Sequence, residues 1–182
     1  MTNGERISNS VLARIPLREY RRLKKQLEPV TLTFGQIPYE PATAIRHVYF
    51  PLDCLISLLT AVDKRQTLEV GMVGNEGMAG MPFILGIGIS GVRAIVQGGG
   101  NALRMAAAPF RREFDRNRAL QEALYRYTYA LMAQISQTAA CNRFHNAEAP
   151  FGALAPDDPR SSGRGRVSPH PRVSGAYAWV AA

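Results

Sequence analysis

A stretch of 39 residues, from Phe110 to Glu148, contains neither glycine nor proline, and it constrains the fold more than any other feature. Pro109 stands directly before it, where proline favours the first turn of a helix. Side chains within the stretch recur at alternating steps of four and three residues, the heptad spacing of a helical seam. The seam comprises Leu120, Leu124, Tyr127, Leu131, Gln134, Thr138 and Cys141, with Ile135 one residue off it. We therefore predict one long helix over residues 109–148.

The length of this helix favours a dimer. A helix of roughly 50 Å is longer than a small β-domain can cover, given a rise of about 1.5 Å per residue. Part of the seam then needs another partner, and a parallel pair of helices from two copies of the chain is the simplest one. The alternative is a helix that packs wholly on its own β-domain. The predicted dimer contacts are Leu120, Leu124, Tyr127, Leu131, Gln134, Ile135 and Thr138.

The region before the long helix has the pattern of short β-strands. Runs rich in β-branched and aromatic residues alternate with Gly, Pro and Asp, which is typical of antiparallel sandwiches and barrels. The runs are VTLTFGQIPYE, HVYFPLDCLISLLTAV, TLEVGMVG and RAIVQGGGNALRMAA, with a hairpin tip at Val62–Gln66. Residues 11–27 have helical spacing instead, and Pro16 divides them into two short helices.

The chain is basic, with a net charge of +8 over 182 residues. Lys and Arg release counterions from phosphates, so this balance suits a nucleic-acid partner, although a basic protein without such a partner has the same composition. The run Arg18, Arg21, Arg22, Lys24 and Lys25 fits either a solvated helix face or a nucleic-acid contact.

The sequence predicts no enzyme and no catalytic, metal-binding or cofactor-binding residue. His47 and His145 stand apart from any nucleophile signature, and the two cysteines, Cys54 and Cys141, are too few for an iron–sulfur cluster. GIGISG, residues 86–91, matches the dinucleotide fingerprint, but it lies between strand-like runs and lacks the acid that holds the ribose. The N-terminus lacks an apolar signal core, and no apolar run approaches the roughly 20 residues of a membrane span. A cytoplasmic location is therefore expected.

The order of these parts resembles the sensor half of Crp/Fnr-family transcription regulators. The resemblance covers residues 11–148 and is carried by LEPVTL, IRHVYFP, LEVGMVGNEGMAGMPFILG, RAIVQ, ALRM and SQTAACNRFHNAE. It implies a mainly β fold with helices: a double-stranded β-helix of jelly-roll topology, like a cyclic-nucleotide-binding domain, with N-terminal helices and a long C-terminal dimerisation helix. It also implies a small-molecule effector and regulation of transcription by a DNA-bound homodimer. A stand-alone module for a cyclic nucleotide or another small ligand is the alternative.

The resemblance also locates an effector site. Family members that bind cyclic AMP hold the ribose with a Gly-Glu pair and the cyclic phosphate with an Arg-Ser pair. Here Ala79-Gly80 aligns with the first pair and Val92-Arg93 with the second. The acid that holds the ribose and the arginine that holds the phosphate are therefore both absent from their expected positions. Cyclic AMP should therefore bind poorly or not at all, and the pocket would take another small ligand or none. The predicted ligand-binding residues are Glu76, Gly77, Met78, Ala79, Gly80, Val92, Arg93 and Ala94.

The predicted domains are a β-roll sensor with its N-terminal helices over residues 1–108, the dimerisation helix over 109–148, and a tail over 149–182. The tail is rich in Pro, Gly, Ser and Arg and shows no pair of helices, whereas the family has a winged helix-turn-helix in this place. Three explanations are open: a disordered extension, a natural end of a shortened regulator, or a frameshift. Frameshifted back-translation from Glu148 permits a family-like continuation, which favours the frameshift. DNA binding by this chain is then expected to be lost or weak.

Overall fold

The computed structural model describes residues 7–62 and 66–145. The chain begins with two short helices, α1 (Ser10–Ala13) and α2 (Leu17–Lys24), which are separated at Pro16 as the sequence predicts. Asn9 caps α1, because its side-chain oxygen accepts the N–H of Leu12 at 3.2 Å. The amide of Asn9 also donates to the carbonyls of Pro51 and Gly77, at 3.0 and 2.9 Å. One buried asparagine thus ties the N-terminal helices to the strands.

Six strands of the described chain form two antiparallel sheets of three strands each. The strands are β1 (Glu28–Leu32), β2 (His47–Pro51), β3 (Leu55–Ala61), β4 (Thr67–Val73), β5 (Arg93–Gly98) and β6 (Gly100–Ala106). The sheet orders are β1-β6-β2 and β4-β3-β5. A 3₁₀ helix, η1 (Met81–Leu85), lies between β4 and β5. The predicted jelly-roll with N-terminal helices and a long C-terminal helix is confirmed.

The strand boundaries differ from the predicted runs where backbone turns intervene. The run over residues 30–40 is not one strand, because β1 ends at Leu32 and Gly35 follows with φ +80. Residues 93–107 divide into β5 and β6 at Gly99. Val62 and Gln66 close the β3–β4 hairpin through a backbone hydrogen bond of 2.9 Å, while residues 63–65 lie outside the described chain.

One part of the core lies between the first sheet and α3 (Ala107–Arg116), within a single buried cluster that also includes residues of α1, α2 and the second sheet. Val48 and Phe50 of β2 are opposite Met105 and Leu103 of β6, so these side chains share one face of the sheet. Phe110 of α3 packs on that face, with its ring centroid 6.4 Å from that of Phe50. These buried aromatic rings fix α3 against the strands, which matters below because α3 and α2 share one end of the molecule.

The long helix predicted over residues 109–148 is interrupted, and this part of the prediction is wrong. α3 ends at Arg116 and α4 (Arg118–His145) begins two residues later. Asn117 between them has extended backbone angles, φ −112 and ψ 95. Its N–H donates to the carbonyl of Glu113 at 3.0 Å, and its side-chain oxygen accepts the N–H of Leu120 at 2.9 Å. One asparagine therefore closes one helix and caps the next.

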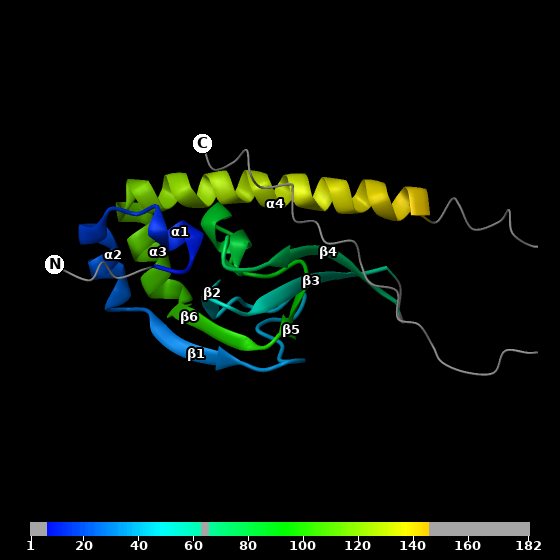
Figure 1. Cartoon of the computed structure of the whole chain (residues 1–182), viewed down its shortest axis with the longest axis horizontal. Helices are drawn as coiled ribbons and strands as arrows, with labels where there is room; N and C mark the ends of the chain where they lie inside the picture. The colour runs from blue at the N-terminus through cyan, green and yellow to red at the C-terminus, as the bar shows by residue number, and fades with distance from the viewer. Residues whose placement is uncertain (1–6, 63–65, 146–182) are drawn as a thin grey trace, which may run out of the picture.

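α4 runs along one side of the β-roll, above the β3–β4 hairpin (Figure 1). Its seam faces the chain's own strands and α1. Leu120, Leu124, Tyr127 and Leu131 are buried within the single chain. Gln134, Ile135 and Thr138 are half-buried, and a Cβ on Gly71 of β4 would contact the first two of them. The buried part of the predicted dimer seam thus packs within the chain. This agrees with the alternative in which the helix packs on its own β-domain. The predicted tail, residues 149–182, lies outside the described residues.

Candidate effector site

The first half of the predicted effector site is the loop that follows β4. Its carboxylate, Glu76, turns back on the loop and accepts the N–H of Gly74 at 2.8 Å. Gly77 lies against α4, since a Cβ placed on it would be 2.0 Å from Cζ of Tyr127. The carbonyl of Gly77 accepts the Asn9 amide. Glu76 and Gly77 therefore hold the loop in place.

The next three residues of the loop enter the core. Met78 and Ala79 are 0% and 1% exposed. Ala79 pairs with Tyr49 of β2 through two backbone hydrogen bonds of 3.0 and 2.8 Å. Gly80 has φ +107, and a Cβ there would come within 3.0 Å of a Val48 methyl carbon, so glycine is required for both conformation and space. The segment aligned with the ribose-binding pair is consequently buried backbone with no acidic side chain.

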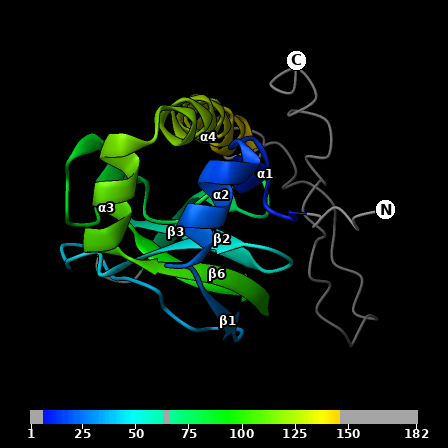
Figure 2. The same ribbon diagram turned by 90° about the vertical axis from the view of Figure 1, so that its left-hand side faces the viewer.

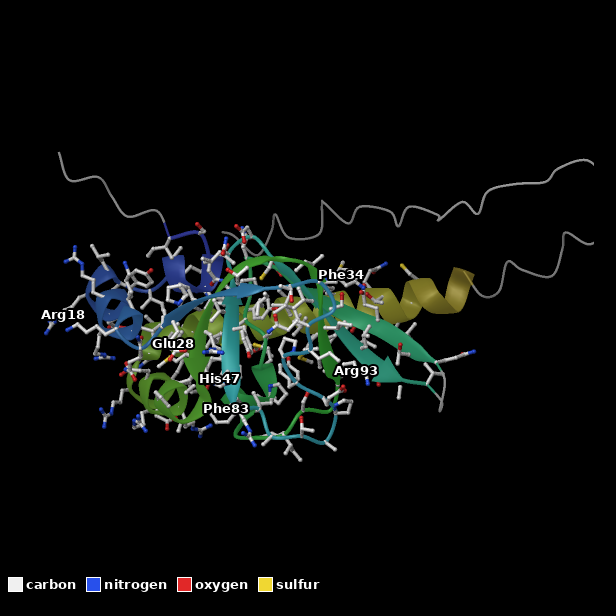
Figure 3. The ribbon with its side chains drawn as sticks, turned by 90° about the horizontal axis from the view of Figure 1, so that it is seen from below. Arg18, Glu28, Phe34, His47, Phe83 and Arg93 are labelled. Carbon is white, nitrogen blue, oxygen red and sulfur yellow. The ribbon has the colours of Figure 1, made fainter. Side chains whose placement is uncertain are left out.

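The second half of the site lies at the start of β5, where strand alternation separates the side chains. Ala94 is fully buried, and Val92 packs partly buried against the same core. Arg93 lies between them in sequence and therefore faces the opposite side of the strand. Its Nε is 2.7 Å from Oε2 of Glu40, and the two side chains are 41% and 38% exposed. The one cation among the predicted ligand residues is thus paired internally, away from the core (Figure 3).

Tyr39 connects the two halves of the predicted site. Its carbonyl accepts the N–H of Ala94 at 3.0 Å, while its hydroxyl accepts the N–H of Gly80 at 3.2 Å. The side chain is only 6% exposed, and burial raises the pKa of the phenol to about 12. A buried, neutral tyrosine therefore links the two segments that would hold a cyclic nucleotide.

The segment around Tyr39 is held to the chain before β5 by further backbone hydrogen bonds. Val96 donates to Gln36, Ser90 donates to Thr43, and Ile45 donates to Gly88, at 2.8 to 3.1 Å. GIGISG thus pairs with residues 42–45 and opens no helix, whereas a dinucleotide fingerprint would lead into one. Sequence reasoning missed Tyr39 and Glu40 because nothing local marks them. Their roles arise from pairing with residues more than forty positions away.

A polar cluster lies next to this site on β1, β2 and β6. Arg104 Nη2 is 2.8 Å from Oε2 of Glu28, and this hydrogen bond and charge lower the pKa of the carboxyl. Burial raises the pKa of Tyr49 and lowers that of His47, and the charge of Arg104 lowers the His47 pKa further. His47 therefore favours its neutral form at neutral pH.

A separate pocket of about 420 Å³ lies at the other end of the first sheet. It is lined by Ser8, Pro29, Val30, Thr31, Leu52, Asp53, Asn101 and Ala102, none of which belongs to the predicted site. The two places are thus different candidates for a small ligand. In residues 7–62 and 66–145 no group of three His, Cys, Asp or Glu side chains could hold a metal ion. No described helix is long and apolar enough to cross a membrane.

No protein-family model matches the sequence, and no curated protein matches it. Solved structures do resemble it in fold. The N-terminal domain of a transcriptional regulator from Streptomyces coelicolor A3(2) is 12% identical, with a TM-score of 0.52 over 81% of this chain and 96% of that one. The catabolite activator protein of Thermus thermophilus is also 12% identical, with a TM-score of 0.56 over 76% and 63%.

A third similar structure is the regulatory subunit of a cAMP-independent protein kinase A from Trypanosoma brucei. It is 14% identical, with a TM-score of 0.57 over 68% of this chain and 44% of that one. The chain therefore spans only part of the length of two of these three proteins. At such identities the similarity concerns the fold alone, and the fold is that of the cyclic-nucleotide-binding jelly-roll.

Proposed function

We propose that this chain is the sensor and dimerisation part of a Crp/Fnr-type transcription regulator. The observation that carries the proposal is α4, which packs along β4 and continues beyond the region that its own β-roll covers. Its seam is fully buried only as far as Leu131, and residues 139–141 are exposed. Isolated helical turns are marginal in water, so a second copy of the chain is the natural support for this end.

The surface of α4 supplies a suitable contact for a second copy. Tyr125, Tyr129 and Met132 are 53%, 60% and 62% exposed and follow one another at four and three residues. They therefore form a continuous stripe on the side of α4 that is turned away from the buried seam. The proposed dimer uses this stripe, because Gln134 and Ile135 face Gly71 of β4 in their own chain and Thr138 lies one turn beyond Gln134 on the same side of α4. The predicted contacts nearer the start of α4 are engaged within the chain.

The effector of this module is not cyclic AMP. The arginine nearest the phosphate position faces away from the core, and Tyr39 occupies the space between the loop and β5. A cyclic phosphate there would lack a charge-assisted contact of about 1.5–3 kcal/mol. The effector is another small molecule.

Sedimentation equilibrium and calorimetry on the full chain test this proposal together. We expect the mass of a dimer at micromolar concentration and no heat of binding on titration with cyclic AMP. A monomer that binds a small ligand would favour the stand-alone module instead. Micromolar affinity for cyclic AMP would contradict the proposal that cyclic AMP is not the effector. A gel shift with palindromic upstream DNA, at stated salt, then measures whether any sequence-specific DNA binding remains.

A further inference from the structure

One end of the molecule concentrates positive charge from two helices that are separate in sequence. Residues 17–25 and 107–116 together hold eight Lys and Arg against three Asp and Glu. Figure 2 shows α2 and α3 side by side at this end. Their contact is fixed by Glu113 of α3, whose Oε2 is 3.0 Å from Nε of Arg22 and whose Oε1 accepts the Gln26 amide at 3.0 Å.

The basic side chains of α2 form a stripe. Arg18, Arg21, Arg22 and Lys25 are spaced at three, four and seven residues from the first, so they share one face of the helix. All four are exposed, whereas Tyr20 and Leu23 on the opposite face are buried. Figure 3 shows Arg18 projecting from this end of the molecule. α3 adds a shorter row, Arg112 and Arg116, which are one helical turn apart and exposed.

Few carboxylates neutralise this surface. Glu113 is only 7% exposed and is engaged by Arg22 and Gln26, and Asp115 pairs with Arg111 at 3.2 Å. Five cations of the two helices have no ion pair with any described residue: Arg18, Arg21, Lys25, Arg112 and Arg116. We name these five residues the basic face. They supply uncompensated charge on two helices whose relative position is fixed by packing.

We propose that the basic face binds the phosphate backbone of duplex DNA without reading its sequence. Four of its five cations are arginines, whose planar forks match phosphate oxygens. Leu17 is the only exposed large apolar side chain of α2 and α3. The surface therefore lacks the apolar anchors of a protein interface or a membrane-bound helix. Backbone contact needs only charge and position, which this face provides.

The salt dependence of binding gives a numerical test. Each phosphate that is neutralised contributes a slope of about −0.9 in log K against log salt, so five contacts give at most about −4.5. We expect the full chain to bind a fluorescent duplex of about 20 base pairs with a slope of about −3 to −4.5. A second duplex of unrelated sequence should bind equally well. A preference for one duplex above about tenfold would overturn the proposal, since it would show base readout.

Single glutamine variants locate the contact. Arg18→Gln, Arg21→Gln and Arg112→Gln should each weaken binding about threefold to tenfold at about 50 mM salt and reduce the slope by about one. Arg93→Gln is the matched control, because it removes the same charge from an exposed arginine away from this end (Figure 3). We expect it to change the affinity less than about twofold. Equal losses in the control, or no loss in the three variants, would refute the assignment to the basic face.

Two further ligands distinguish duplex DNA from an acidic protein or a membrane as the partner. An acidic polyglutamate peptide and phosphatidylserine vesicles carry negative charge without a duplex backbone. We expect neither to bind at a salt concentration where DNA binds. Stronger binding of either one than of DNA would contradict the proposal in favour of an acidic protein or a membrane. The outcome is independent of the proposed function, because it requires neither an effector nor a dimer.

Discussion

Tyr39 is the residue on which the candidate site most depends, and its ionisation can be measured. Burial raises the pKa of the Tyr39 phenol in the folded chain from its usual 10.0 to about 12. Above pH 10 the unfolded chain ionises this group while the folded chain keeps it neutral. The contribution of Tyr39 to stability is therefore fully present below pH 10 and is lost as the pH rises towards 12.

Tyr39→Phe should be less stable than the native chain at pH 8, and this difference in stability should shrink as the pH rises above 10. At pH 8 the variant should be about 1 kcal/mol less stable than the native chain, because the Gly80 N–H loses its acceptor. At pH 11 the native chain should have lost about 1 kcal/mol that the variant retains, so the difference should nearly vanish. Urea unfolding at both pH values measures this. A constant difference would show that Tyr39 does not resist ionisation in the fold.

Gly77 makes a second prediction at the scale of one residue. Gly77→Ala would place a methyl carbon 2.0 Å from Cζ of Tyr127. Either α4 or the loop must move, at a cost of about 1–3 kcal/mol in the free energy of unfolding. Gly91→Ala is the control, because it has φ outside the left-handed range and nothing within 4 Å of its Cβ position. Chemical denaturation should leave this control within about 0.5 kcal/mol of the native chain. Equal effects in the two variants would contradict the close approach of α4.

The division between α3 and α4 rests on one capping residue. Asn117→Ala removes the oxygen that accepts the Leu120 N–H and should lower stability by about 1 kcal/mol. Asn117→Ser keeps an oxygen of the same capping type and should lower it less. Thermal unfolding of the two variants measures the difference. If serine is no better than alanine, the cap is not what stabilises the start of α4.

The same asparagine shows what the sequence could predict about elements and what it could not. The absence of Gly and Pro after Pro109, together with apolar spacing, correctly predicted helix. It could not predict the interruption, because Asn117 breaks the backbone while satisfying the hydrogen bonds on both sides. In the same way, alternation predicted the strands, yet the face taken by Arg93 follows from its register against Leu59 and from the pairing of Ala94 with Tyr39. Such register is a long-range property.

At the scale of the whole molecule, burial decides between two possible dimer faces of α4. The heptad seam was predicted as the dimer contact, but Leu124 and Leu131 already pack on their own chain. The stripe of Tyr125, Tyr129 and Met132 is more than half exposed, although the Tyr125 ring contacts Phe114 edge-on, and its apolar area in water favours association. A dimer through this stripe leaves the packing of each β-roll intact, whereas a dimer through the buried seam requires α4 to leave its own strands.

Charge substitutions distinguish these two faces. Tyr129→Glu combined with Met132→Glu should abolish the dimer, because association would bury carboxylates against a second apolar stripe. The fold should persist, since both side chains are about 60% exposed. Gln137→Glu introduces the same charge on an exposed part of another face of α4 and should leave the dimer unchanged. Sedimentation equilibrium gives the mass and circular dichroism the helix content. If the double variant stays dimeric with full helix content, the copies meet through another surface, and the uncovered end of α4 needs a different explanation.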